Sequence, residues 1–189
     1  MKQIQIDNVI YNVNTDFRTA IECNRIAEDN TIGDLERVLG IICTLYGAEA
    51  LDHPNHYEKL IKWGLNYLSG GNKVENKEPD MDFIKDKGLI ISSFKYDYKY
   101  NPYDREYLSW EEFYNDLNNL SSNVELGNCC VLNRARYWRN YDTSKIKDSK
   151  ERKQAEEIKK YYALNKEPKK EFTLEEQNNM EEFYKQMGL

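Results

Sequence analysis

Apolar residues spaced three and four positions apart recur along this chain, and this spacing constrains its fold more than any other feature. It places the apolar side chains on one face of an α-helix, where they can pack against neighbouring helices. The first helix is predicted to end near residue 29 after a cap at Asn14 or Thr15, the second to start at Thr31 or Gly33, and the third to span about 55–68 before Gly70-Gly71. Their apolar faces are formed by Phe17, Ala20, Ile21 and Ala27, by Leu35, Val38, Leu39, Ile42 and Leu45, and by Leu60, Ile61, Gly64, Leu65 and Leu68.

Further helices are predicted over about 80–95, 125–141 and 149–164. The start of another is marked more sharply, because Ser109 and Glu112 have the capping-box spacing and Leu108 and Phe113 that of a hydrophobic staple. That helix is predicted to begin at Trp110. The tyrosines at 96, 98 and 100 alternate as in a strand and also continue a helix, so the conformation of 96–107 is left open.

Near the N-terminus the apolar residues have a different spacing. Apolar residues alternate with polar ones on both sides of Asp7-Asn8, two residues that tolerate the left-handed backbone of a tight turn. We therefore expect a mainly α fold, a helical domain with a short N-terminal β-hairpin. Residues 1–164 are assigned to this domain, with a polar linker at about 70–80. Residues 165–189 are assigned to a C-terminal tail, in which a Thr173–Glu176 capping box precedes an amphipathic helix bearing Leu174, Met180, Phe183, Tyr184 and Met187.

The sequence contains little that indicates catalysis. His53 and His56 lie beside Asp52 and could hold a metal, but His-x-x-His alone also fits a polar turn before a helix. The glycine pair is not followed by Lys-Ser or Lys-Thr, and the four cysteines lack C-x-x-C spacing. We expect buried reduced thiols, no metal, no cofactor and no enzymatic activity.

Positive charge is concentrated in one region of an acidic chain. The net charge is -6, yet ten basic and five acidic residues between Arg134 and Lys160 give that region +5 and leave -11 for the remainder. Such a region suits a protein partner or nucleic acid, but Glu156 and Lys160 also form the i, i+4 pair of an ordinary solvated helix. All three interpretations are kept, and nucleic acid is the least favoured because the chain is acidic.

No apolar run approaches the roughly 20 residues of a membrane span, and Met1–Tyr11 is polar and alternating, unlike a signal peptide. A cytosolic protein is expected.

Four segments in order resemble the bacteriophage gene-product-fifteen family, which is counted among the tail assembly chaperones of long-tailed phages. They are the hairpin leading into VNTDFRTAIE, the aromatic FKYDYKY, the helix LSWEEFYNDLNNL, and an arginine-containing helix followed by DTSKIKDSKERKQAEEIKKYYAL. The resemblance covers roughly Ile4 to Leu164.

The resemblance implies a helical, non-enzymatic chaperone in the host cell cytoplasm, not expected in the mature virion. It would bind the tape measure protein and recruit the tail tube protein; self-association is left open. Partner-binding candidates are an apolar groove of Trp110, Phe113 and Leu117, which also suit core packing, and the basic residues Arg134, Arg136, Arg139, Lys145 and Lys147. The alternative is a small phage nucleic-acid-binding protein that uses the basic 134–160 region.

Overall fold

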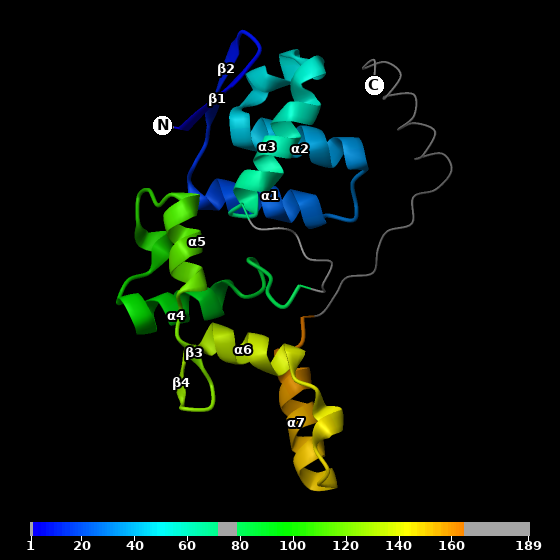
Figure 1. Cartoon of the computed structure of the whole chain (residues 1–189), viewed down its shortest axis with the longest axis vertical. Coiled ribbons are helices and arrows are strands. Elements are labelled where there is room, and N and C mark those ends of the chain that lie inside the picture. The colour runs from blue at the N-terminus through cyan, green and yellow to red at the C-terminus, as the bar shows by residue number, and fades with distance from the viewer. Residues whose placement is uncertain (1, 72–78, 165–189) are drawn as a thin grey trace, which may run out of the picture. The chain divides into compact units, whose positions relative to one another are not determined.

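The computed structural model describes residues 2–71 and 79–164 (Figure 1). The described chain divides into two compact units. The N-terminal unit contains residues 2–71 and 109–111, and the C-terminal unit contains residues 79–108 and 112–164. The predicted amphipathic helix after Pro168 and most of the predicted linker lie outside the described residues.

The N-terminal unit opens with the predicted β-hairpin. Strands β1 (Lys2–Ile6) and β2 (Val9–Val13) pair antiparallel, with Ile6 opposite Val9. Asp7 takes a φ of 52°, the left-handed conformation that the turn requires and that aspartate tolerates. Because side chains alternate between the faces of a strand, Tyr11 and Val13 are buried while Ile10 and Asn12 face outward.

Three helices follow the hairpin: α1 (Phe17–Glu28), α2 (Asp34–Tyr46) and α3 (Tyr57–Leu68). Helix α1 is capped by Asp16, whose carboxylate accepts from the Arg18 backbone N–H at 2.8 Å, and not by Asn14 or Thr15. The chain is still extended at Asp16, which bridges to Ser109, so the predicted caps lie one and two residues too early. The prediction of Ala27 on the apolar face is also wrong, since Cys23 and Ile26 are buried instead.

Between α2 and α3 the chain forms two short 3₁₀ turns, η1 (Ala48–Asp52) and η2 (Pro54–His56). The buried tyrosines beside them have hydrogen-bonded hydroxyls: Tyr46 donates to the Leu60 carbonyl at 2.8 Å and Tyr57 to the Leu51 carbonyl at 2.7 Å. Burial raises the pKa of the Tyr46 hydroxyl, and it raises the pKa of the Cys23 thiol to about 12. All four cysteines are free thiols, and Cys23, Cys129 and Cys130 are buried as expected, whereas Cys43 is half-buried.

The C-terminal unit begins with a turn instead of the helix predicted from residue 80. The Asp82 carboxylate accepts from the backbone N–H groups of Ile84 and Lys85, and the Asp86 carboxylate accepts from that of Asp82. These side-chain bonds satisfy donors that a helix would otherwise use, so helix α4 (Lys87–Tyr98) begins seven residues late. It ends at left-handed Lys99 and is followed by the 3₁₀ turn η3 (Pro102–Asp104), which settles the conformation of 96–107 that the sequence left open.

Helix α5 (Trp110–Asn118) begins at the predicted residue, but the prediction for the next segment is wrong over 125–130. There the chain forms a small hairpin of β3 (Ser122–Asn123) and β4 (Asn128–Cys129), in which Gly127 has a φ of 70°. Helix α6 (Val131–Asn140) follows, and the 3₁₀ turn η4 (Thr143–Lys145) leads to α7 (Ser149–Tyr162). The prediction of a mainly helical fold with an N-terminal β-hairpin is confirmed. Within the described ranges, no helix is both long and apolar enough to cross a membrane.

Candidate protein-interaction surface on helices α6 and α7

The three predicted apolar groove residues lie in the interior. Trp110, Phe113 and Leu117 on α5 are all buried. Within the C-terminal unit the ring of Phe113 stacks on Phe94 of α4, with 5.3 Å between ring centroids and an interplanar angle of 12°. With exposed fractions of 1%, 0% and 3%, these side chains offer almost no surface to a partner, and their burial agrees with the core-packing interpretation.

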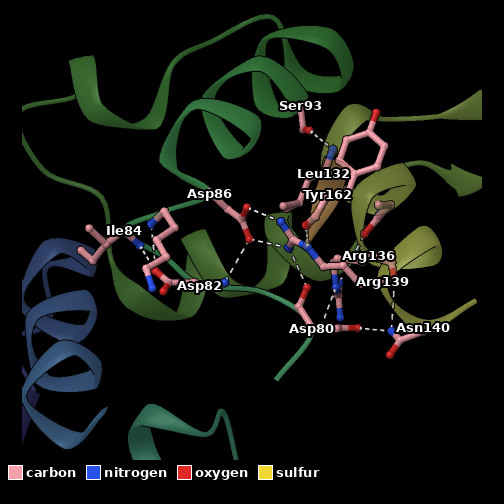
Figure 2. Close-up of polar contacts among 12 residues, drawn as sticks. Asp80, Asp82, Ile84, Asp86, Ser93, Leu132, Arg136, Arg139, Asn140 and Tyr162 are labelled. Carbon is pink, nitrogen blue, oxygen red and sulfur yellow. Dashed lines mark hydrogen bonds and ion pairs between the residues drawn. The ribbon is translucent and has the colours of Figure 1, made fainter. Parts of the chain in front are cut away.

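Arg139, one of the predicted basic contacts, is buried and binds other parts of the C-terminal unit (Figure 2). Its two terminal nitrogens donate to the two carboxylate oxygens of Asp86, each at 2.7 Å, while the side chains are only 10% and 4% exposed. The same guanidinium donates to the backbone carbonyls of Asp80 at 2.8 Å and Tyr162 at 2.6 Å. Bidentate geometry and these further bonds compensate the burial of both charges. Arg139 therefore joins α6 to the turn before α4 and to the end of α7.

Arg136 lies one turn earlier on α6 and has a carboxylate partner as well. Its Nε donates to Asp80 Oδ1 at 3.0 Å, and the other oxygen of Asp80 accepts from the side-chain amide of Asn140 (Figure 2). The side chains of Arg136 and Asp80 are 35% and 28% exposed, so solvent screens this pair partly. Two of the three predicted arginines are thus neutralised inside the C-terminal unit.

The start of α6 is fixed by a neighbouring helix. Ser93 of α4 is buried, donates to its own helix at the Leu89 carbonyl, and accepts from the Leu132 backbone N–H at 3.0 Å. Cys130 caps the same end through its sulfur. Because Leu132 and Ala135 face inward, the helical period turns Arg134 and Tyr137 toward solvent.

Helix α7 is held by few contacts. Asp148 caps it by accepting from the N–H groups of Lys150 and Glu151, and Ala155 is its only buried residue. Besides the bond from Arg139 to the Tyr162 carbonyl, Lys159 donates to the Tyr141 carbonyl at 2.8 Å. The rest of α7 presents its side chains to solvent.

The other predicted basic residues are exposed. Lys145 makes a long ion pair with Asp142 at 3.6 Å between exposed side chains, which contributes little. Lys147 and Arg134 are exposed as well, and neither forms an ion pair with the described residues. Arg134 is therefore the one arginine of α6 whose charge is not matched by a carboxylate in the described parts of the chain.

Two surface depressions flank α6. The first, of about 550 Å³, is lined by Asp80, Val124, Arg136, Tyr137, Tyr141 and Lys145 among others. The second, of about 660 Å³, lies between α6 and α7 and is lined by Arg134, Trp138, Gln154, Glu157, Ile158, Tyr161 and Tyr162. Its large apolar side chains are missing from the sequence-based candidates. They could have been found from their spacing, because Ile158, Tyr161 and Tyr162 stand three and four apart on an otherwise charged helix.

The two histidines form a structural contact in the N-terminal unit. Buried His56 lies with Nδ1 2.6 Å from the Tyr11 hydroxyl and Nε2 3.2 Å from Asp7 Oδ2, and its ring stacks on His53. Burial, followed by the charge of Asp7, raises the pKa of Tyr11, which keeps the hydroxyl protonated. No group of three or more potential metal ligands occurs among residues 2–71 and 79–164.

The chain was compared with known protein families and with solved structures. A family model described as Bacteriophage Gp15 protein matches residues 1–164, which include every described helix. No curated protein and no solved structure matches the chain significantly.

Proposed function

Because the chain belongs to the Bacteriophage Gp15 protein family, we propose that this phage protein is a tail assembly chaperone that binds the tape measure protein and aids assembly of the tail tube. It acts in the host cell cytoplasm, leaves the finished tail, and performs no catalysis. Its partners are the tape measure protein and the tail tube protein, and a second copy of the chain is a further candidate.

The observation that carries this proposal is the solvent-exposed aromatic and basic surface of α6 and α7. A chaperone for a long helical client needs apolar side chains that a client helix can cover and charges that keep the free protein soluble. Tyr161 is 81% exposed, and α7 carries Lys150, Lys153 and Lys160 on its solvated side. The internal neutralisation of Arg136 and Arg139 favours this function over the alternative of nucleic-acid binding, because it removes cations that phosphates would need.

The test is co-expression with the tape measure protein of the same phage genome, followed by co-purification and light scattering at low and moderate salt. We expect a soluble complex that withstands moderate salt, because burial of apolar surface drives its formation. Tape measure protein that stays insoluble, or a complex with nucleic acid that dissociates steeply as salt rises, would contradict the proposal.

A further inference from the structure

The two depressions beside α6 differ in whether their basic side chains have acidic partners within the protein. In the first, Arg136 and Asp80 face each other as an ion pair, and Lys145 lies near Asp142. In the groove between α6 and α7, hereafter the α6–α7 groove, the guanidinium of Arg134 has no carboxylate within ion-pair distance among the described residues. The α6–α7 groove therefore offers a partner a cation that has no carboxylate of its own, whereas Arg136 and Lys145 in the first depression each have an acidic neighbour.

The α6–α7 groove also collects the exposed apolar surface of this region. Trp138 comes from α6, and Ile158 and Tyr161, 38% and 81% exposed, come from α7. Residues three apart on a helix lie on one face, so Ile158 and Tyr161 present a continuous apolar edge along α7. The ring of Tyr162 lies 5.0 Å from that of Tyr161 at an angle of 80° and extends this edge. An exposed apolar row beside one unmatched cation is the pattern of a groove that binds an amphipathic helix.

The charged residues around the α6–α7 groove determine which charge its partner should carry. Lys150, Lys153 and Lys160 are exposed on α7 and make no ion pair with described residues, while Glu157 is the acidic residue of the groove itself. Helix α7 carries five basic and three acidic residues. This excess of positive charge beside an apolar row favours partners with carboxylates at the edge of their apolar face.

The anchoring of α7 does not depend on the groove side chains. Ala155, the Lys159 bond and the bond from Arg139 to the Tyr162 carbonyl hold the helix, and the last of these uses backbone of Tyr162. Tyr161 and Arg134 can therefore be replaced without removing any of these three contacts, and Ile158, which is 38% exposed, takes part in none of the three.

We propose that the α6–α7 groove is the client site, and that its occupant is an amphipathic helix of the tape measure protein with a carboxylate positioned to pair with Arg134. This inference rests on the proposed function and adds to it a location and a charge requirement. Trp138, Ile158 and Tyr161 cover the apolar face of the client helix, and Arg134 fixes its register.

The test uses the full chain and fluorescent peptides that tile the predicted helices of the tape measure protein, with binding measured by anisotropy. The peptide bound most tightly by the unaltered chain serves as the probe. We expect the double change Ile158→Ser and Tyr161→Ser, and separately Arg134→Glu, to weaken its binding at least about 10-fold, as for central contacts of an interface. Changing one probe carboxylate to lysine should restore binding to Arg134→Glu.

The matched control is Tyr137→Ser, because Tyr137 lies on the same helix, is 38% exposed like Ile158, and lines the other depression. The probe affinity of Tyr137→Ser should stay within about twofold of that of the unaltered chain, and every variant should keep a single cooperative transition in urea, which shows that it is folded. Equal affinity of the groove variants and the unaltered chain would overturn the inference while leaving the chaperone proposal intact. Groove changes that alter the mass of the free protein in light scattering would overturn it in favour of a second copy as occupant. If no peptide and no full-length tape measure protein binds the unaltered chain, the proposed function fails first.

Discussion

Helices α2 and α7 are nearly equal in length but bury very different amounts of side chain. The 13 residues of α2 bury Leu35, Ile41, Ile42, Leu45 and Tyr46, whereas the 14 residues of α7 bury only Ala155. Helix α2 packs against both α1 and α3, so its apolar face is covered within the N-terminal unit. Helix α7 packs against α6 and keeps Ile158 and Tyr161 at the surface. The exposed surface of these two residues is not covered by the described part of the chain and is available for a partner.

The two regions are also stabilised by different kinds of contact. The N-terminal unit depends on apolar packing, with tyrosine hydroxyls that donate to nearby backbone carbonyls. The α6–α7 region depends on polar bonds that converge on Arg139. Substitutions at matched positions should therefore have unequal effects in the two regions.

Arg139→Ala should have the largest effect. It leaves Asp86 buried without its cation and removes the bond to the Tyr162 carbonyl, so the free energy of unfolding should fall by about 3–5 kcal/mol. Urea denaturation followed by circular dichroism measures this loss. Arg136→Ala is the matched control, because its partly exposed pair with Asp80 should cost at most about 1 kcal/mol. Equal losses for the two variants would show that the buried Arg139–Asp86 pair stabilises the fold no more than the partly exposed Arg136–Asp80 pair.

Tyr11→Phe tests the N-terminal unit. The Tyr11 hydroxyl lies 2.6 Å from Nδ1 of buried His56, so the variant leaves that nitrogen without its hydrogen-bond partner. A loss of about 1–2 kcal/mol in unfolding free energy is expected. Tyr161→Phe is the control from the exposed groove, and its stability should not change measurably. A comparable loss at Tyr161 would contradict the assignment of that residue to a free surface.

Much of this architecture followed from the sequence, whereas the start of α4 did not. The hairpin at Asp7 and the start of α5 at Trp110 were predicted correctly because local turn and capping chemistry determines them. The start of α4 was wrong because carboxylates of Asp82 and Asp86 bind backbone N–H groups, and an amphipathic pattern does not reveal this.

The candidate surface was predicted less well than the fold. A basic segment in the sequence shows where the arginines are but not which carboxylates they pair with. The partners of Arg136 and Arg139 are carboxylates more than fifty residues earlier in the chain. Contacts this distant in sequence depend on the tertiary fold, so spacing could not separate these two arginines from Arg134. The predictions for Trp110, Phe113 and Leu117 as partner contacts remain to be tested by measurement.

Gly64→Ala should show how closely the N-terminal unit is packed. A new Cβ would lie 3.1 Å from Leu45 Cδ2 and 3.2 Å from the Tyr46 hydroxyl, which is itself held by its bond to the Leu60 carbonyl. The crowding outweighs the better helix propensity of alanine, so we expect a net loss of about 1 kcal/mol, measured by urea denaturation. Increased stability would mean that Leu45 and Tyr46 move aside at little cost.

Gly88→Ala, in the C-terminal unit, should have the smallest effect and the opposite sign. Gly88 lies in the first turn of α4, takes no left-handed conformation, and a Cβ there would have no atom within 4 Å. Alanine reduces the conformational freedom of the unfolded chain without crowding the native one, so the free energy of unfolding should rise by about 0.5 kcal/mol. A shift in the urea midpoint at constant slope would measure it. Because both changes replace a helical glycine with alanine, opposite signs at positions 64 and 88 would attribute the difference to packing and exclude helix propensity as its cause.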